Sequence, residues 1–566
     1  MINVDLRKQP YNLDDEGVKW VEETIKSMTL EEKIGQLFIN MGASRDEEYL
    51  KGVLDNYHIG GVRYNPGKAE EVYEQNKILQ ENSKIPLLIA ANTEMGGNGA
   101  CTDGTYIGNE VKIAATNDKR YAYEMGRVSG VEAAAIGCNW SFAPIVDINR
   151  NWRNPIISTR TWSADVEQTL ELSLEYMRGI MESGIAPAAK HFPGDGIDER
   201  DQHLSFAPNS LSVEEWDATF GRVYSGLFEA GLPSIMAGHI ALPEYVKYFN
   251  PEATTQEIYM PATLSKYVLT DLLRGKMKFN GLVVTDASHM VAMTSAMKRS
   301  EMLPTAIAAG SDLFLFFNDP DEDFEWMMEG YKNGIITDER LEEALTRILG
   351  TKAALGLHKK AKTEILPEKE VAMAKIGLEE NKAIAKEVSD KAITLVKNTK
   401  NQLPLTPETH KRIMLYTVEQ AGFAPNKVEA DRLNQRVKDK LEAQGFEVTL
   451  FDPAAGLNGK QLLAATPIKE FVDQFDAVML FVHVAGFSQS NVRRITWAMP
   501  MGPDIPWYVT ELPTVCVSVF NPFHLIDVPM VPTYINAYSD NDATLDLVIE
   551  KIMGKSEFKG DRKSVV

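Results

Sequence analysis

The stretch Gly281-Leu282-Val283-Val284-Thr285-Asp286 is a short apolar run that ends in a carboxylate. Seven similar runs lie elsewhere in residues 1–360, and amphipathic helical patterns such as 166–183 and 213–230 separate most of them. Strands that alternate with helices imply a parallel sheet. The expected strands are residues 34–39, 61–64, 86–91, 139–144, 186–191, 234–240, 281–286 and 312–317.

Eight strand–helix units in about 350 residues predict an α/β protein with a (β/α)8 TIM-type barrel. An open doubly wound sheet is the alternative for the same alternation. That fold commonly carries a glycine-rich phosphate-binding turn after a strand, and no such turn follows any of the expected strands. The barrel is therefore the preferred architecture of this part of the chain.

The rest of the chain has its own strand–helix pattern. Residues 361–380 are charged and show no strand pattern, so we expect a linker there between a catalytic barrel, 1–360, and a second domain, 381–566. A length of 566 residues also favours more than one domain. Apolar runs at 412–416, 447–451, 477–484, 514–519 and 533–537 predict a smaller α/β sandwich.

The composition and net charge of the chain limit the classes of partner that it is expected to bind. The net charge is -21, and such a surface repels nucleic-acid phosphates, so we expect no nucleic-acid partner. No stretch approaches the roughly 18 apolar residues that cross a bilayer, and the first seventeen residues lack the apolar core of a signal peptide. We therefore expect no membrane association and a cytoplasmic location. The oligomeric state stays open, an oligomer included.

Cysteine usage points away from cross-links. The chain has three cysteines, Cys101, Cys138 and Cys516, and they are widely spaced. An odd number at such spacing argues against a disulfide framework or a zinc site. We expect each to be a small buried apolar side chain.

Polar residues follow five of the expected barrel strands where those strands end. In this fold the carboxyl ends of the strands build the active site. A single aspartate at such a place is more often the N-cap of the next helix, whereas five polar strand ends in register predict a site. The residues are Asn92, Glu94, Asp147, Lys190, His191, His239 and Asp286.

The segment 190–203 reads KHFPGDGIDERDQH. An apolar strand brings Lys190 and His191 to its end, and a loop with proline and glycine follows and finishes in Asp201-Gln202-His203. Taken alone, this segment fits a solvated surface loop equally well. Its combination with the carboxylate at Asp286 is much less expected by chance.

These two segments make the chain resemble glycoside hydrolase family 3, within its β-N-acetylhexosaminidase (NagZ-like) branch. A lysine-histidine loop ending in Asp-x-His is typical of that branch. Further resemblances lie at 28–38, 142–148 and 154–162, and in the second domain at 395–398, 403–405, 521–523 and 534–537. The motif at 28–38 is helical in the family, which conflicts with a strand at 34–39.

The resemblance implies roles for individual residues. Asp286 matches the catalytic nucleophile, His203 the acid/base, and Asp201 the partner that orients His203. Residues expected to hold the sugar or line the barrel mouth are Lys190, His191, Arg160, Asn92, Glu94, Asp147, His239 and Met290.

The chemistry agrees with these residue types. Retaining cleavage of a glycoside needs a carboxylate that attacks the anomeric carbon and a group that protonates the leaving oxygen. An imidazole titrates near pH ~6.5 and does both halves of that proton transfer at neutral pH. An aspartate two residues before His203 fixes the ring tautomer through a hydrogen bond.

The chain departs from the family pattern at two places. The family motif Asp-x-Glu-Gly-Gly-Arg is replaced by Asn92-Thr93-Glu94-Met95-Gly96-Gly97-Asn98, which lacks the first carboxylate and the arginine. A loop histidine is replaced by Asp195, which we expect to change loop packing. The first change weakens the case for strict GlcNAc preference, and GalNAc or an unacetylated hexose becomes a candidate glycone.

We therefore expect a retaining exo-β-N-acetylhexosaminidase that hydrolyses terminal β-linked GlcNAc or GalNAc from small carbohydrates. A β-glucosidase or a phosphorolytic family 3 enzyme is the alternative, since a histidine does not repel incoming phosphate as a carboxylate would. An inactive sugar-binding protein is disfavoured by the intact Asp286, Asp201 and His203. The sequence contains no HExxH, CxxC or P-loop, and we expect neither a metal nor an organic cofactor.

Overall fold

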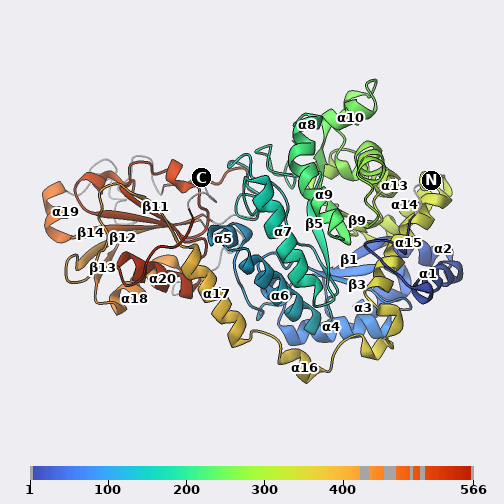
Figure 1. Ribbon diagram of the computed structural model, residues 1–566, viewed down its shortest axis with the longest axis horizontal. Coiled ribbons are helices and arrows are strands. Elements are labelled where there is room, and N and C mark those ends of the chain that lie inside the picture. Colours follow the sequence, from blue (N-terminus) through green and yellow to red (C-terminus); the bar gives the residue numbers. More distant parts are fainter. Residues whose placement is uncertain (1–3, 421–431, 452–466, 485–487, 498–503, 562–566) are drawn as a thin grey trace. The chain divides into compact units, whose positions relative to one another are not determined.

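The computed structural model describes residues 4–420, 432–451, 467–484, 488–497 and 504–561. It divides into two compact units, one of Met1–Ile107 with Lys119–Lys382 and the other of Gly108–Asp118 with Ala383–Val566 (Figure 1). The chain thus enters the second unit briefly at 108–118 before it completes the first. The segment 361–380, expected to be a linker, contains a short 3-10 helix (Lys362–Glu364) and the helix α16 (Lys369–Met373), and it ends in the first turn of α17 (Glu379–Ala392).

The first unit is a closed barrel of eight parallel strands in the order β1-β10-β9-β7-β5-β4-β3-β2. Because β1 pairs with both β2 and β10, the sheet has no free edge. This confirms the TIM-type barrel over an open sheet. The strands are β1 (Phe38–Gly42), β2 (Gly61–Tyr64), β3 (Leu88–Ala91), β4 (Trp140–Ser141), β5 (Ala186–Phe192), β7 (Ser234–Ala237), β9 (Leu282–Ala287) and β10 (Leu313–Leu315).

The first expected strand, 34–39, was placed too early. Residues up to Gly35 belong to the helix α2 (Leu30–Gly35), and β1 starts at Phe38. Thr29 caps this helix: its hydroxyl accepts from the Glu32 N–H at 3.2 Å, and the Glu32 carboxylate accepts from the Thr29 N–H at 3.0 Å. This reciprocal cap starts a helix, and the apolar run continues from it into the strand without a break.

Helices surround the barrel strands, as Figure 1 shows around β1, β3, β5 and β9. The expected helix 166–183 is α7, whereas 213–230 is divided into α8, a π-helical segment (Asp217–Gly221) and α9. The longer helices are α1 (Asp15–Ser27), α3 (Glu47–Tyr57), α4 (Ala69–Asn82), α6 (Arg120–Ala135), α7 (Val166–Met181), α9 (Arg222–Glu229), α13 (Arg299–Ala309), α14 (Pro320–Lys332) and α15 (Asp338–Ala354). Shorter elements of the loops are α8 (Val213–Trp216), α10 (Pro243–Phe249), α11 (Thr255–Ile258), α12 (Val291–Thr294) and the pair β6 (Ala207–Pro208) and β8 (Ile240–Ala241).

The second unit is a six-stranded sheet in the order β11-β16-β15-β14-β12-β13, with only the edge strand β11 antiparallel. The strands are β11 (Thr394–Asn398), β12 (Arg412–Gln420), β13 (Glu447–Leu450), β14 (Ala477–Val484), β15 (Thr514–Ser518) and β16 (Thr533–Asn536). Five of the six were expected as strands, and β11 was not. The helices that follow the barrel are α17 (Glu379–Ala392), α18 (Leu433–Ala443), α19 (Ile468–Gln474) and α20 (Asp542–Ile552), and the 108–118 segment holds α5 (Glu110–Ala115).

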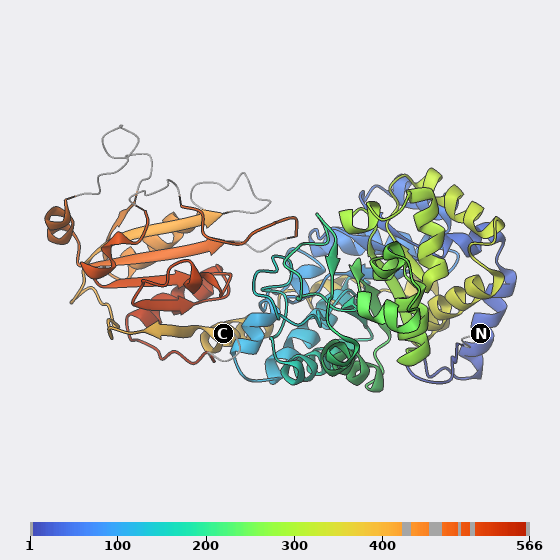
Figure 2. The ribbon, with the colours of Figure 1, turned by 90° about the horizontal axis from the view of Figure 1, so that it is seen from above.

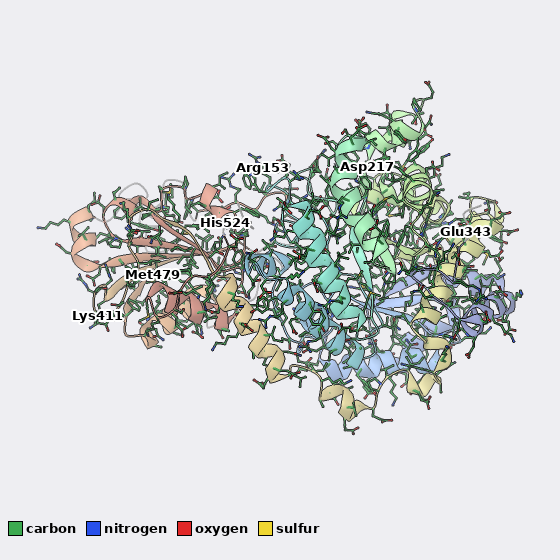
Figure 3. The ribbon with its side chains drawn as sticks, viewed as in Figure 1. Arg153, Asp217, Glu343, Lys411, Met479 and His524 are labelled. Atoms are coloured by element: carbon green, nitrogen blue, oxygen red, sulfur yellow. The ribbon has the colours of Figure 1, made fainter. Side chains whose placement is uncertain are left out.

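Each face of this sheet carries a buried apolar layer, and Figure 2 shows the strands of the sheet from above. One face packs on α18 and α20 around Met479, a fully buried side chain that Figure 3 labels. The other face packs around Tyr416, Phe471 and Tyr508. Two buried layers on one sheet confirm the smaller α/β sandwich.

Two remaining expectations concern the whole chain. Cys101, Cys138 and Cys516 are buried free thiols, as expected. Within the described ranges no helix is both long and apolar enough to cross a membrane.

Candidate active site

Asp286 lies next to the last residue of β9, where the barrel strands end. Its carboxylate accepts from the Ala287 N–H at 2.7 Å, and its Oδ2 lies 4.0 Å from Nε2 of His191. Burial opposes ionisation here, but the positive charge that His191, His239 and His203 carry when protonated lowers the pKa of Asp286 below its ordinary value. Asp286 is therefore held as a carboxylate, the form that a nucleophile needs.

A second carboxylate fixes the histidine that faces Asp286. Asp147, fully buried after β4, accepts from Nδ1–H of His191 at 2.7 Å and from its backbone N–H at 3.1 Å. A carboxylate accepts only, so Nδ1 carries the proton and Nε2 points to Asp286. The ring of His191 is thus locked in orientation and in tautomer.

Glu94, Arg160 and Lys190 form a buried charged cluster at the same end of the barrel. The Glu94 carboxylate accepts from Arg160 at 2.9 and 3.0 Å and from the Lys190 ammonium at 2.5 Å. Burial alone would raise the pKa of Glu94, but the two cations lower it well below its ordinary range. Beside the cluster, Oδ1 of the half-buried Asn92 has no hydrogen-bond partner among the described residues.

The expected acid/base pair is also assembled. His203 donates its Nδ1–H and its backbone N–H to the Asp201 carboxylate at 2.7 and 2.8 Å. The side chain of Asp201 is fully buried, whereas that of His203 is 25% exposed. Nε2 of His203 is therefore the ring nitrogen left to exchange a proton with a substrate.

The loop that carries His203 is hydrogen-bonded to the loop that follows the nucleophile strand. The carbonyls of Gln202 and His203 accept from the N–H groups of Ala292 and Val291, each at 3.1 Å. Met290, which was expected to line the site, is buried and directly precedes Val291 and Ala292 in the chain. These bonds join the loop of Asp201 and His203 to the loop after the strand that ends at Asp286.

His239 contacts the backbone directly after Asp286. Its Nε2–H donates to the Ala287 carbonyl at 2.9 Å, and its Nδ1 lies 2.9 Å from the Thr263 hydroxyl. Burial lowers the pKa of His239, which favours the neutral ring that this arrangement requires. His239 therefore supports the backbone beside Asp286.

Three residues of the site were not singled out from the sequence as site residues. Arg63, a charged residue within β2, is half-buried and close enough to interact with the charge of Glu94, and burial lowers its pKa. Asp195 and Gln202 are both buried and hydrogen-bonded to each other. The sequence signal for Arg63 is a charge inside an apolar barrel strand, whereas the partners of Asp195 and Gln202 are set by loop folding alone.

A closed barrel with an ionised carboxylate and a histidine–aspartate pair at its strand ends is compatible with a glycoside hydrolase. Residues 29–351 match the family model described as "Glycosyl hydrolase family 3 N terminal domain". The chain belongs to glycoside hydrolase family 3, and the resemblance noted from its motifs is confirmed.

Relatives cover the whole chain. An enzyme of Cellulomonas fimi named "Beta-N-acetylglucosaminidase/beta-glucosidase" is 40% identical over 557 residues, 98% of this chain and 97% of its own. A solved structure titled "Beta-glucoside phosphorylase BglX bound to 2FGlc" has 39% identity and a TM-score of 0.91, with 100% and 99% of the two chains covered. A β-N-acetylglucosaminidase from Paenibacillus sp. str. FPU-7, at 22% identity, shares the fold with a TM-score of 0.77 over 95% of this chain and 100% of its own.

Proposed function

We propose that this chain is a retaining exo-β-glycosidase that removes terminal β-linked GlcNAc and glucose through a covalent intermediate on Asp286. The observation that carries the proposal is the pair of chemically different groups at the barrel mouth. Asp286 is kept ionised, and His203 is oriented by Asp201 with its second ring nitrogen free to exchange a proton.

Each step has a group to perform it. A carboxylate oxygen of Asp286 bonds to the anomeric carbon while the bond to the leaving oxygen breaks and protonated His203 gives its proton to that oxygen. In the second half, neutral His203 takes a proton from a water whose oxygen replaces Asp286 at the anomeric carbon. Glu94, Arg160 and Lys190 hold the sugar hydroxyls in register for both halves.

A substrate panel tests this assignment. We expect turnover of 4-nitrophenyl β-GlcNAc and β-glucoside, with the β-anomer as the first-formed product by proton NMR. The β-N-acetylhexosaminidase expectation is thereby widened to unacetylated glucose, in line with the name of the Cellulomonas fimi relative. First-formed α-anomer, or no turnover of either substrate, would contradict the proposal.

A second candidate, phosphorolysis, is favoured by the identity of the acid/base. Hydrogen phosphate is anionic and needs no general base, and a neutral imidazole does not repel it as a carboxylate does. The relative titled as a β-glucoside phosphorylase supports the same reading. With phosphate present, we expect a sugar 1-phosphate of retained configuration to exceed the free sugar among the products; an unchanged yield of free sugar would rule phosphorolysis out.

A further inference from the structure

The loop between β5 and β6 carries the acid/base pair, and one glutamine ties it down. Gln202 lies between Asp201 and His203 and is 1% exposed. Its Oε1 accepts from the backbone N–H of His239 at 2.8 Å, and its Nε2 donates to Oδ2 of Asp195 at 3.1 Å. A backbone N–H only donates, so the amide orientation of Gln202 is fixed and its NH2 must face an acceptor at Asp195.

Asp195 is that acceptor, and every neighbour of its carboxylate is a donor. Its Oδ1 accepts from Nδ2 of Asn154 at 2.7 Å and from the Gly196 N–H at 2.6 Å. Its own N–H donates at 2.7 Å to Asp147, the residue that fixes His191. Burial and then the negative charge of Asp147 raise the pKa of Asp195 to about 8, and the three N–H donors oppose only part of that shift.

These contacts join the loop to three other barrel strand ends. Asn154 belongs to the loop after β4, His239 follows β7, and the Ala292 N–H that donates to the Gln202 carbonyl follows β9. Gln202 is thereby fixed by its backbone and by both ends of its side chain. Since His203 is the next residue along the chain, its ring cannot move far while these bonds hold.

We propose that Asp195 and Gln202 are positioning residues that clamp the Asp201–His203 pair over the nucleophile. The inference rests on the proposed function of His203 as acid/base. The clamp governs proton transfer to the leaving oxygen rather than sugar binding, because neither residue belongs to the Glu94–Arg160–Lys190 cluster. Loss of the clamp therefore lowers the rate most for substrates whose leaving group must be protonated.

An exchange of the two groups tests the clamp. Asp195→Asn leaves an amide facing the Gln202 amide. At a pH above about 8, where Asp195 is a carboxylate, Gln202→Glu sets two carboxylates against each other, so at that pH each single variant breaks the contact. In the double variant Asp195→Asn/Gln202→Glu the new glutamate accepts from the His239 N–H and from the new asparagine. That asparagine still accepts from Asn154 and Gly196 through its oxygen. All the hydrogen bonds are therefore restored, and only the bond between positions 195 and 202 has its donor and acceptor exchanged.

The readout is kcat/KM on two β-glycosides, one with a 4-nitrophenolate leaving group and one with an alkyl alcohol. We expect each single variant to lose at least about tenfold more on the alkyl glycoside, with the loss in kcat rather than KM, and the double variant to recover to within about threefold of the parent. Asp198→Asn is the matched control: its carboxylate in the same loop pairs with the exposed Arg200. Equal losses on both substrates, or a double variant as poor as the product of the singles, overturns the proposal.

Hydrogen exchange gives a readout that needs no turnover. In both single variants we expect faster amide exchange over residues 193–209 and 289–293 and unchanged exchange in the second unit. In the double variant and in Asp198→Asn we expect the exchange rates of the parent protein. Unchanged exchange in the single variants overturns the clamp. A parent protein that cleaves no glycoside overturns the proposed function instead, while the exchange data still decide the clamp.

Discussion

At the scale of the residue, three carboxylates of the site have three different tasks because their neighbours differ. Asp286 faces histidines, Asp147 accepts from His191, and Asp201 accepts from His203. Asp147 and Asp201 in turn fix the tautomers of His191 and His203. The proposed division into nucleophile, support and acid/base partner rests on the hydrogen-bond chemistry at each position.

His203 has a role that depends on the leaving group. We expect His203→Ala to lose far less activity on a nitrophenyl glycoside than on an alkyl glycoside, because a nitrophenolate departs with little protonation. Asp201→Asn should show a weaker form of the same pattern, since it leaves the ring in place and disturbs only its orientation. The measurement is kcat/KM on both substrates; losses of equal size would remove His203 from the role of general acid.

We propose that Asn92 faces the side of the sugar away from the anomeric carbon. Its Oδ1 is buried without a hydrogen-bond partner among the described residues, in the place where the family motif has a carboxylate. A site built for one hydroxyl rejects the wrong epimer because buried groups lose partners. We predict that matched aryl β-GlcNAc and β-GalNAc differ in kcat/KM by less than about 100-fold, near ~3 kcal/mol. A larger preference for GlcNAc would show that Asn92 does not relax the selection.

At the scale of the element, strand starts were predicted more closely than strand ends: the runs 234–240 and 412–416 begin with β7 and β12 but end at other residues. The expected runs 61–64 and 477–484 coincide with β2 and β14, because each is an apolar run between polar turns. The predicted strand at 34–39 was wrong in its start because the first residues of this apolar run belong to the helix α2 and only the last belong to the strand β1. β11 was not predicted because it is a mixed edge strand, and edge strands lack the continuous apolar pattern of buried ones.

Among the site residues, those at strand ends could be predicted and those held by loop contacts could not. Residues at strand ends, such as Lys190, His191 and Asp286, were found because the barrel fold sets where strand ends meet. The clamp of Asp195 and Gln202 was not found, because its partners come from loops after three other strands. Loop-to-loop hydrogen bonds have no periodic signal in a sequence.

The cap of α2 gives a test at this scale. Thr29→Ala removes the hydroxyl that accepts from the Glu32 N–H, and such a change costs about 1 kcal/mol. We expect a lower Tm for the barrel unit, by differential scanning calorimetry, with kcat unchanged. Ser27→Ala, an exposed position two residues earlier, is the control and should leave Tm nearly unchanged; an equal fall in both variants would contradict the role of the cap.

At the scale of the whole molecule, one buried lysine makes stability depend on pH. Lys352 in α15 is fully buried and donates to Oε1 of Gln36 at 2.7 Å, and burial lowers its pKa to about 7 from 10.5. Between these two values the unfolded chain binds more protons than the folded chain. The contribution of Lys352 to stability therefore rises with pH across this window.

Comparison with Lys352→Met isolates that contribution. We expect the Tm of the parent, relative to the variant, to rise between pH 7 and pH 9, with a slope in unfolding free energy approaching about 1.4 kcal/mol per pH unit. Below pH 7 the difference should be constant, because both states then carry the proton. A difference that is flat up to pH 9, or that falls, would mean that Lys352 titrates normally in the folded protein.

The account as a whole depends on a covalent bond between the sugar and Asp286, and a trapped intermediate tests that bond directly. A 2-deoxy-2-fluoro-β-glucosyl fluoride forms the intermediate faster than it is hydrolysed, because fluorine destabilises the oxocarbenium-like transition state of each step while the fluoride leaves readily. After proteolysis and mass spectrometry, we expect one fluoroglucosyl group on the peptide that contains Asp286, and none in Asp286→Asn. A label on any other carboxylate, or no label in a protein that turns over β-glucosides, would contradict the assignment.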